Sequence, residues 1–412
     1  MPAHHQPTRR SVLRLLGVAA GATAGVAVSP LTGAPAWATT SRATSGTTSG
    51  TTSGAAAGVE PNHDGIVRLP ISFGNADFPE IVGGVYQGPN LVEASGAVAS
   101  RRYPGVLWII RDGYQFDQPE PVRSRYRNAL YAVRFNPLSG RLLRWPTGVP
   151  SVYGGGYLRY VPMRDADGTV PRMVSEDIAL APASDGGPDM LWCGDIGNNN
   201  FGAHAGRLWR CAEPNPYLDA EVTLDGLLTY WTNPDHTGPQ GNCESLLALH
   251  GSLYLIVKNV AAGGPLTVGQ VLRLPAQVGG GAVDAVPVAR LRPPAGVNWQ
   301  PTAADLVDGS LLVSTARHWI RYEADPTLTG DDLIRALAAE TPTAYGFWNP
   351  DETTGANEGI AWLRTGPQGG FMGVSEPGIL RWWPRQVAGR ETARGRGHLA
   401  RPRRCPDPAV EV

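Results

Sequence analysis

Three glutamates occupy equivalent places in a repeated pattern of this chain: Glu176, Glu244 and Glu358. Each begins a phrase in which small or acidic residues lead into an apolar run, and Ser95 and Ala304 begin the other two copies. Carboxylates that are brought together must either raise a pKa or share a cation. Hard divalent cations such as calcium take oxygen ligands from such clusters. The pattern therefore predicts an acidic metal site, with calcium as its cofactor.

A second acidic position follows directly, at Asp177 and Asp305. Successive residues of a strand point to opposite faces, so only one of the two positions is expected to face a common axis. We assign that role to the glutamates and keep the two aspartates as further metal ligands or as partners of backbone N–H groups. The alternative is that all these acids bond the amides of neighbouring repeats and hold the repeats together.

A second apolar run follows in each repeat and ends on polar residues. Lys258 is the single lysine of the chain, and its compact ammonium suits a phosphate, a carboxylate or a nearby glutamate. Arg317 suits the same anion through two parallel bonds. We expect both to bind substrate, although a chance lysine in an arginine-rich chain explains Lys258 as well. The polar ends are Arg111-Asp112, Asp195, Lys258, Arg317-His318 and Ser375-Glu376.

An Asn- and Gly-rich loop follows Asp195. Its Asn198 and Asn199 carry amide oxygens that suit calcium or a polar substrate, and Asp195 is a candidate metal ligand. Asn and Gly also favour tight turns for backbone reasons alone, so a purely structural loop is the alternative.

Repeated units of two to four short strands must position these residues. The five phrases lie 54 to 81 residues apart, and a third strand is expected in every unit. A fourth is expected at 141–145 in the first unit and at 227–231 in the second. Such units are typical of β-propeller blades. We predict an all-β fold with a single five-bladed propeller, closed by an N-terminal strand at 65–70. Six blades are the main alternative, and a helix is expected from Asp331 to Glu340.

The phrases Glu176-Asp177-Ile178-Ala179 and Gly194-Asp195-Ile196-Gly197-Asn198-Asn199 resemble those of exported bacterial propeller proteins of poorly assigned function. That group is distantly similar to phytase-like and gluconolactonase-like propellers, and the resemblance spans residues 90–384. It implies acidic groups at a central channel that bind calcium or another divalent cation. Asn198 stands where this group often has Asp. The run 109–112 stands where a phrase with His, Asn and Asp is common, which puts a shared catalytic activity in doubt.

The ends of the chain differ from its body. Residues 1–38 carry Arg9-Arg10 before a weakly apolar run and an Ala-Trp-Ala site, which resembles a twin-arginine export signal. Residues 39–58 predict a flexible Ser/Thr/Gly-rich linker, 59–384 the propeller, and 385–412 a disordered basic tail. The formal net charge is −1, with +3 on residues 1–38, +4 on the tail and −8 on the remainder. An acidic body argues against nucleic acid as a partner.

Two functions fit these features. The first is a calcium-dependent hydrolase that acts on a small phosphate ester or lactone, and the second is a non-catalytic extracellular propeller that binds a small molecule or a protein. No positioned general base is evident, because His236 and His318 are isolated. Serine-hydrolase, zinc-protease and nucleotide-binding motifs are missing from the sequence. We expect a secreted or envelope-associated monomer without a transmembrane span.

Overall fold

The computed structural model describes residues 67–72, 81–82, 85–86, 91, 93–112, 128–136, 141–171, 173–183, 187–198, 201–348, 356–363, 370–376 and 378–383. The chain divides into two units, Met1–Ala56 and Ala57–Val412, and all described residues belong to the second. The predicted export signal (1–38), linker (39–58) and basic tail (385–412) therefore lie outside the described residues.

The described chain is a β-propeller of antiparallel sheets, or blades, each of which begins with its innermost strand. The first blade contains β4 (Ala94–Ala99), β5 (Val106–Arg111), β6 (Ala129–Phe135) and β9 (Leu158–Arg164), with β7 (Leu142–Leu143), β8 (Val152–Tyr153) and the 3-10 turn η2 (Gly154–Gly156). The second contains β10 (Asp177–Ala181), β11 (Met190–Asp195), β12 (Gly206–Ala212), β14 (Gly226–Trp231) and β18 (Val283–Asp284), while β13 (Val222–Thr223) joins β9.

Three four-stranded blades complete the ring. The third contains β15 (Asn242–Leu249), β16 (Ser252–Asn259), β17 (Gln270–Pro275) and β19 (Val286–Arg290). The fourth contains β20 (Pro301–Val307), β21 (Ser310–Thr315), β22 (His318–Glu323) and β23 (Ala344–Phe347), with the helix α2 (Gly330–Ala339) before β23. The fifth contains β24 (Asn357–Trp362), β25 (Phe371–Ser375), β26 (Ile379–Trp383) and β1 (Val67–Ser72).

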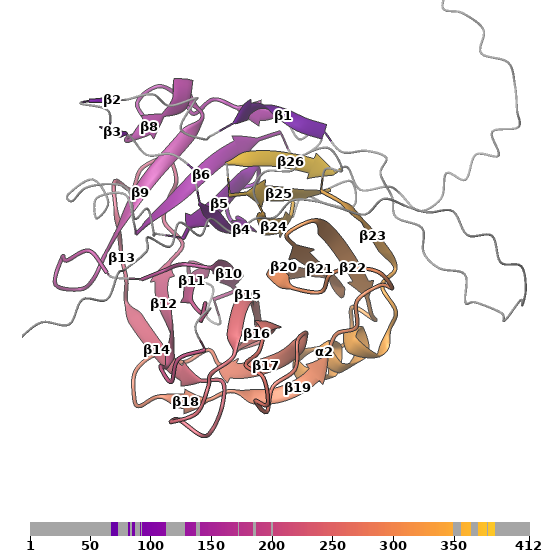
Figure 1. Ribbon diagram of the computed structural model, residues 1–412. Helices are drawn as coiled ribbons and strands as arrows, with labels where there is room; N and C mark the ends of the chain where they lie inside the picture. The colour runs from indigo at the N-terminus through magenta and orange to yellow at the C-terminus, as the bar shows by residue number, and fades with distance from the viewer. Residues whose placement is uncertain are drawn as a thin grey trace, which may run out of the picture. The chain divides into compact units, whose positions relative to one another are not determined.

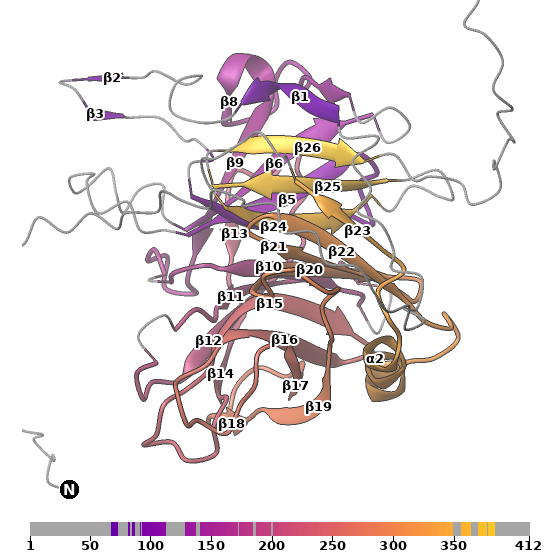
Figure 2. The same ribbon diagram turned by 45° about the vertical axis from the view of Figure 1, so that its right-hand side comes forward.

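The N-terminal strand closes the ring, as the sequence predicts. β1 pairs antiparallel with β26, with Val67 opposite Trp382, so the first and last strands share one sheet (Figure 1). The innermost strands contact one another in order, from β4 through β10, β15, β20 and β24 back to β4. Figure 2 shows the same blades after a turn of 45° about the vertical axis. The segment proposed for a sixth blade contributes only β1 and the hairpin β2 (Ile81–Val82) and β3 (Val85–Tyr86) among the described residues.

The hydrophobic core lies between blades, which explains why the inner strands are apolar on both faces. On β5, Leu107 and Ile109 pack in one cluster with residues of the fifth blade, while Trp108 and Ile110 pack in another with residues of the second. Alternate residues of a strand point to opposite faces, so each inner strand must satisfy two neighbours. An unbroken apolar run is therefore what a central blade strand requires.

The fourth strand of the first blade is not where the sequence predicts it. Within the expected stretch 141–145, only β7 is a strand, and it pairs with β6 through two residues. β9 pairs with five residues of β6 instead and is the true fourth strand. Pro162 lies inside β9 and lacks the N–H that a ladder needs, which conceals the strand in the sequence.

Cys193 and Cys211 lie on the adjacent strands β11 and β12, and both thiols are free. Cys193 is opposite Trp209, and Cys211 is opposite Leu191, so the two cysteines are offset along the ladder. Cys243 is also a free buried thiol. The helix α2 confirms the segment predicted at 331–340 to within a residue at each end. No helix in the described part of the chain is long and apolar enough to cross a bilayer.

Candidate functional site

The inner strands begin with irregular pairing at one end of the ring. On β15 the register shifts between Cys243 and Ser245, which leaves Glu244 outside the regular ladder. On β24 the shift lies between Asn357 and Gly359 and leaves out Glu358. A β-bulge of this kind re-aims a side chain relative to strict alternation. The strict alternation expected for regular strand starts therefore does not hold at Glu244 and Glu358.

The three glutamates that the repeat singled out lie close enough to affect one another's ionisation. Glu176 immediately precedes β10 and is 6% exposed, and Glu244 is 3% exposed. The pKa of Glu176 is raised well above its ordinary value by burial and by the charges of Glu244, Asp112 and Glu358. Burial and Glu244 likewise raise the pKa of Glu358. These carboxyls therefore act on one another across three blades.

Lys258 supplies a positive charge close to these carboxyls. Its Nζ forms an ion pair with Oε2 of Glu244, and Nδ2 of Asn242 donates to Oε1 of Glu244 at 3.2 Å. Burial lowers the pKa of Lys258, but the charges of Glu244, Glu358 and Glu176 raise it above its ordinary value. The ammonium is thus committed to the glutamates rather than held ready for an anion.

Two further acids border this group, and the sequence analysis noted them only as polar strand ends. Asp112 follows β5 and raises the pKa of both Glu176 and Glu358, and Glu376 follows β25 and raises the pKa of Glu358. Glu93, with a φ of 60°, connects them, because its N–H donates to O of Glu376 and its carbonyl accepts from N–H of Asp112. Both acids follow the second strand of their blade, and Lys258 lies at the end of the second strand of its own. This shared position is the sequence feature that could have identified them as members of the site.

We call Glu176, Glu244, Glu358, Asp112 and Lys258 the acidic mouth. Burial is the main cause that raises the pKa of Glu176 and of Glu358 well above the ordinary range, the neighbouring carboxyls add to it, and Lys258 only partly offsets both. Among the described residues, however, no three His, Cys, Asp or Glu side chains are grouped so that they could hold a metal ion.

Asp177 has a structural position in the ring. It is completely buried, its Oδ1 accepts from Ile178 N at 2.8 Å, and its Oδ2 accepts from Leu246 N at 2.8 Å and Ala304 N at 3.3 Å. One side chain thus joins the second, third and fourth blades. Burial raises its pKa well above the ordinary value even though these amides oppose the shift.

Asp305 and Ser95 make similar connections between blades. Oδ2 of Asp305 accepts from Trp362 N at 2.7 Å, and Oγ of Ser95 donates to the carbonyl of Glu176 at 2.5 Å. Gly96 leaves room for this arrangement, because a Cβ there would lie 2.6 Å from Oδ1 of Asp177. The alternative in which acids bond the amides of other blades therefore describes Asp177 and Asp305.

The polar groups at the end of β11 and in the loop after it already have partners in the protein. Asp195 forms an ion pair with Arg207, and burial raises the pKa of Asp195 despite that partner. The side chain of Asn198 donates to Gly202 O at 3.1 Å and accepts from Gly202 N at 3.0 Å. Asp195 and Asn198 line a small cavity of about 90 Å³. Asn199 lies outside the described residues.

Arg317 and His318 lie in and after the turn between β21 and β22. Arg317 is exposed. The turn lies next to Asn357, the residue before Glu358, because N and Nδ2 of Asn357 both donate to Ala316 O. His318 is buried, and its pKa is lowered by burial and by Arg317. His236 belongs to the outer part of the second blade, where it contacts Asp284 at 2.7 Å and stacks on Trp231.

Comparisons with known proteins leave the chain without a family. No family model matches it, and no curated protein sequence matches it. A solved structure of Raptor from Chaetomium thermophilum is 10% identical with a TM-score of 0.32, over 73% of this chain and 21% of that one. The structure of BBS1N in complex with ARL6DN is 11% identical with a TM-score of 0.26, over 69% and 73%. Neither is a phytase or a gluconolactonase, so that resemblance stays a prediction.

Proposed function

We propose that this protein is a non-catalytic β-propeller that binds a small organic cation at the acidic mouth. The observation that carries the proposal is that four carboxyl groups act on one another there, while the one lysine among them is paired with Glu244. Glu176 and Glu358 keep strongly raised pKa values beside a lysine that already lowers them. Buried carboxyls in this state gain stability from a proton or from a second cation. A ligand that supplies that cation would release protons as it binds.

The ligand class follows from the cation that the mouth already holds. Glu244 accepts the primary ammonium of Lys258, and both groups are largely buried. Carboxyls placed to accept N–H donors from one ammonium suit a second ammonium near Glu176 and Glu358. We therefore assign the ligand as a primary amine, either a small diamine or the lysine side chain of an extracellular partner protein.

The test is thermal unfolding of the purified chain with 1,4-diaminobutane, with calcium chloride and with a chelator. The proposal expects the diamine to raise the melting temperature and the Glu176→Gln/Glu358→Gln variant to lose this response. The exposed Glu221 supplies a matched control, because Glu221→Gln removes one carboxyl elsewhere on the surface. Equal stabilisation of the wild type and the double variant would overturn the proposal.

A calcium-dependent hydrolase is the second candidate, and one observation favours it. Carboxylic acids with raised pKa values beside a lysine are common among catalytic acids. Calcium, if bound, would supply a Lewis acid near Glu176 and Glu358, and either carboxyl could then give a proton to a leaving group. Turnover of generic phosphate-ester or lactone substrates that depends on calcium and is lost in Glu176→Gln would establish this candidate. Stabilisation by calcium without turnover would support metal binding but not catalysis.

We also propose that the chain is exported through its twin-arginine-type signal. The proposal rests on the sequence of residues 1–38 and makes an extracellular partner possible. Replacing Arg9 and Arg10 by lysine should retain the protein in the cytoplasm if the signal is of this type. Unchanged export of that variant would indicate a general secretory signal instead.

A further inference from the structure

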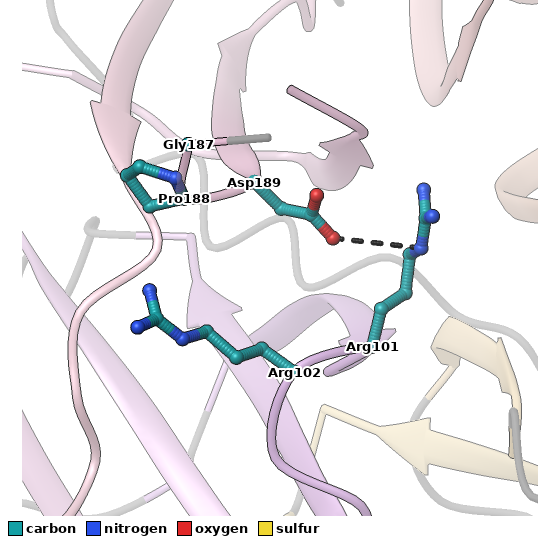
Figure 3. Close-up of a pocket in the computed structure, with 5 residues that line it drawn as sticks. All are labelled: Arg101, Arg102, Gly187, Pro188 and Asp189. Atoms are coloured by element: carbon teal, nitrogen blue, oxygen red, sulfur yellow. Dashed lines mark ion pairs between the residues drawn. The ribbon is translucent and has the colours of Figure 1, made fainter. Parts of the chain in front are cut away.

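A second polar pocket lies at the opposite end of the inner strands from the acidic mouth. Its described lining consists of Arg101, Arg102, Gly187, Pro188 and Asp189, around a volume of about 560 Å³ (Figure 3). The arginines follow β4, and Asp189 precedes β11, which pairs antiparallel with β10. Glu176 is next to the start of β10, so the pocket and the acidic mouth occupy different ends of the ring.

The turn that carries the arginines is fixed by its own hydrogen bonds. Oγ of Ser100 accepts from Tyr103 N at 2.8 Å, and Val106 N donates to Tyr103 O at 3.0 Å. These bonds fix the backbone from which the two arginine side chains extend, while both side chains are exposed.

Arg102 is held by an aromatic column rather than by a carboxylate. Its guanidinium lies 5.6 Å from the centre of the Tyr103 ring, that ring packs on Tyr217 at 6.3 Å, and Tyr217 packs on Trp145 at 5.4 Å. Within the described residues Arg102 forms no ion pair, although its charge lowers the pKa of the buried Glu213. A guanidinium that pairs with no carboxylate of the described residues favours a carboxylate or a phosphate as its ligand.

Asp189 adds a hydrogen-bond acceptor to the two arginines of the pocket. Nε of Arg101 is 3.5 Å from Oδ2 of Asp189, and Ala183 N donates to Oδ1 of Asp189 at 3.2 Å. In Figure 3 Arg101 reaches toward this carboxylate, whereas Arg102 extends toward Pro188. A carboxylate can accept about four hydrogen bonds, so Asp189 retains capacity for a donor on a ligand. The complementary ligand carries an anionic group beside a hydroxyl.

We propose that this pocket binds a small hydroxylated carboxylic acid, with Arg102 and Arg101 on its carboxylate and Asp189 on its hydroxyl. The ligand is an anion and the site is distinct from the acidic mouth, so the inference does not depend on the proposed function. It assigns opposite charge preferences to the two ends of one propeller.

The test is isothermal titration of the whole chain with malate and with succinate, which lacks the hydroxyl. We expect malate to bind at least tenfold more tightly than succinate. Arg102→Gln should weaken malate at least tenfold, Asp189→Asn should remove the preference for malate, and Arg335→Gln on α2 should change neither. The melting temperature of each variant shows whether it is folded. If Arg102→Gln does not fold, Arg101→Gln takes its place in the titration. No malate binding at millimolar concentration, or equal affinity in Arg102→Gln, would overturn the proposal.

Discussion

Gly197 lies directly against the carboxyl of Glu176, and a Cβ at this position would be 2.8 Å from Cδ of that glutamate and would overlap with Oε1. The loop after β11 thus forms one wall of the acidic mouth. No side chain larger than a hydrogen atom fits there unless Glu176 moves. The relationship connects a glycine of this loop to the position of a carboxyl in the acidic mouth.

Gly197→Ala should therefore displace Glu176 and destabilise the fold by about 1–3 kcal/mol, as overpacking of a closed site does. Chemical denaturation measures the loss, and diamine titration measures the accompanying loss of affinity. Gly251→Ala is a control without a steric neighbour, although its positive φ adds backbone strain of its own. Unchanged affinity in Gly197→Ala would show that the position of Glu176 does not matter.

Lys258→Met should leave Glu244 buried without its cation. Removing one partner of a buried ion pair costs about 3–5 kcal/mol, because the remaining charge is unpaired. Adding Glu244→Gln should recover a large part of this loss, since the double variant buries no lone charge. Denaturant unfolding of the two single variants and the double variant forms the cycle that measures the coupling. Additive losses would mean that the pair contributes no coupling.

Asp177→Asn should destabilise the ring by at least about 2 kcal/mol. Both carboxyl oxygens of Asp177 now accept from backbone N–H groups. An amide has only one oxygen, so the NH₂ group of the variant would face a backbone N–H and leave that donor without an acceptor. Asp308→Asn is the control, because Asp308 is an exposed turn residue with a φ of 49°, which asparagine tolerates. Similar melting temperatures for both variants would argue against a role of Asp177 in joining the blades.

Stability should depend on pH through Glu176 and Glu358. Their folded pKa values lie above 4.5, so the folded state holds more protons than the unfolded state, and stability falls as pH rises from about 4.5 through the folded values. Asp177 contributes in the same direction. The Glu176→Gln/Glu358→Gln variant should show a shallower decline in urea unfolding between pH 5 and pH 8. An identical decline in the variant would contradict the assignment.

The fold could be predicted from the sequence further than the site could. The repeated apolar runs locate the inner strands because each must pack on two blades, and the run at 65–70 predicts the closing strand β1. The sequence does not predict β9, because Pro162 in its middle is a residue that usually argues against a strand. The glutamates were found by their common position, but strict alternation could not predict the bulges at Glu244 and Glu358. The partners of Asp177 lie in β15 and β20, and only the closed ring reveals them.

The most direct test of the acidic mouth is isothermal titration of the whole chain with 1,4-diaminobutane at pH 7 and pH 8.5. The proposed site predicts one bound diamine per chain, with an affinity that rises with pH wherever the bound ammonium displaces a proton from Glu176 or Glu358. It also predicts at least a tenfold loss in Glu176→Gln/Glu358→Gln and no loss in Glu221→Gln. Binding that is absent, or that is the same in the wild type and the double variant, would contradict the account.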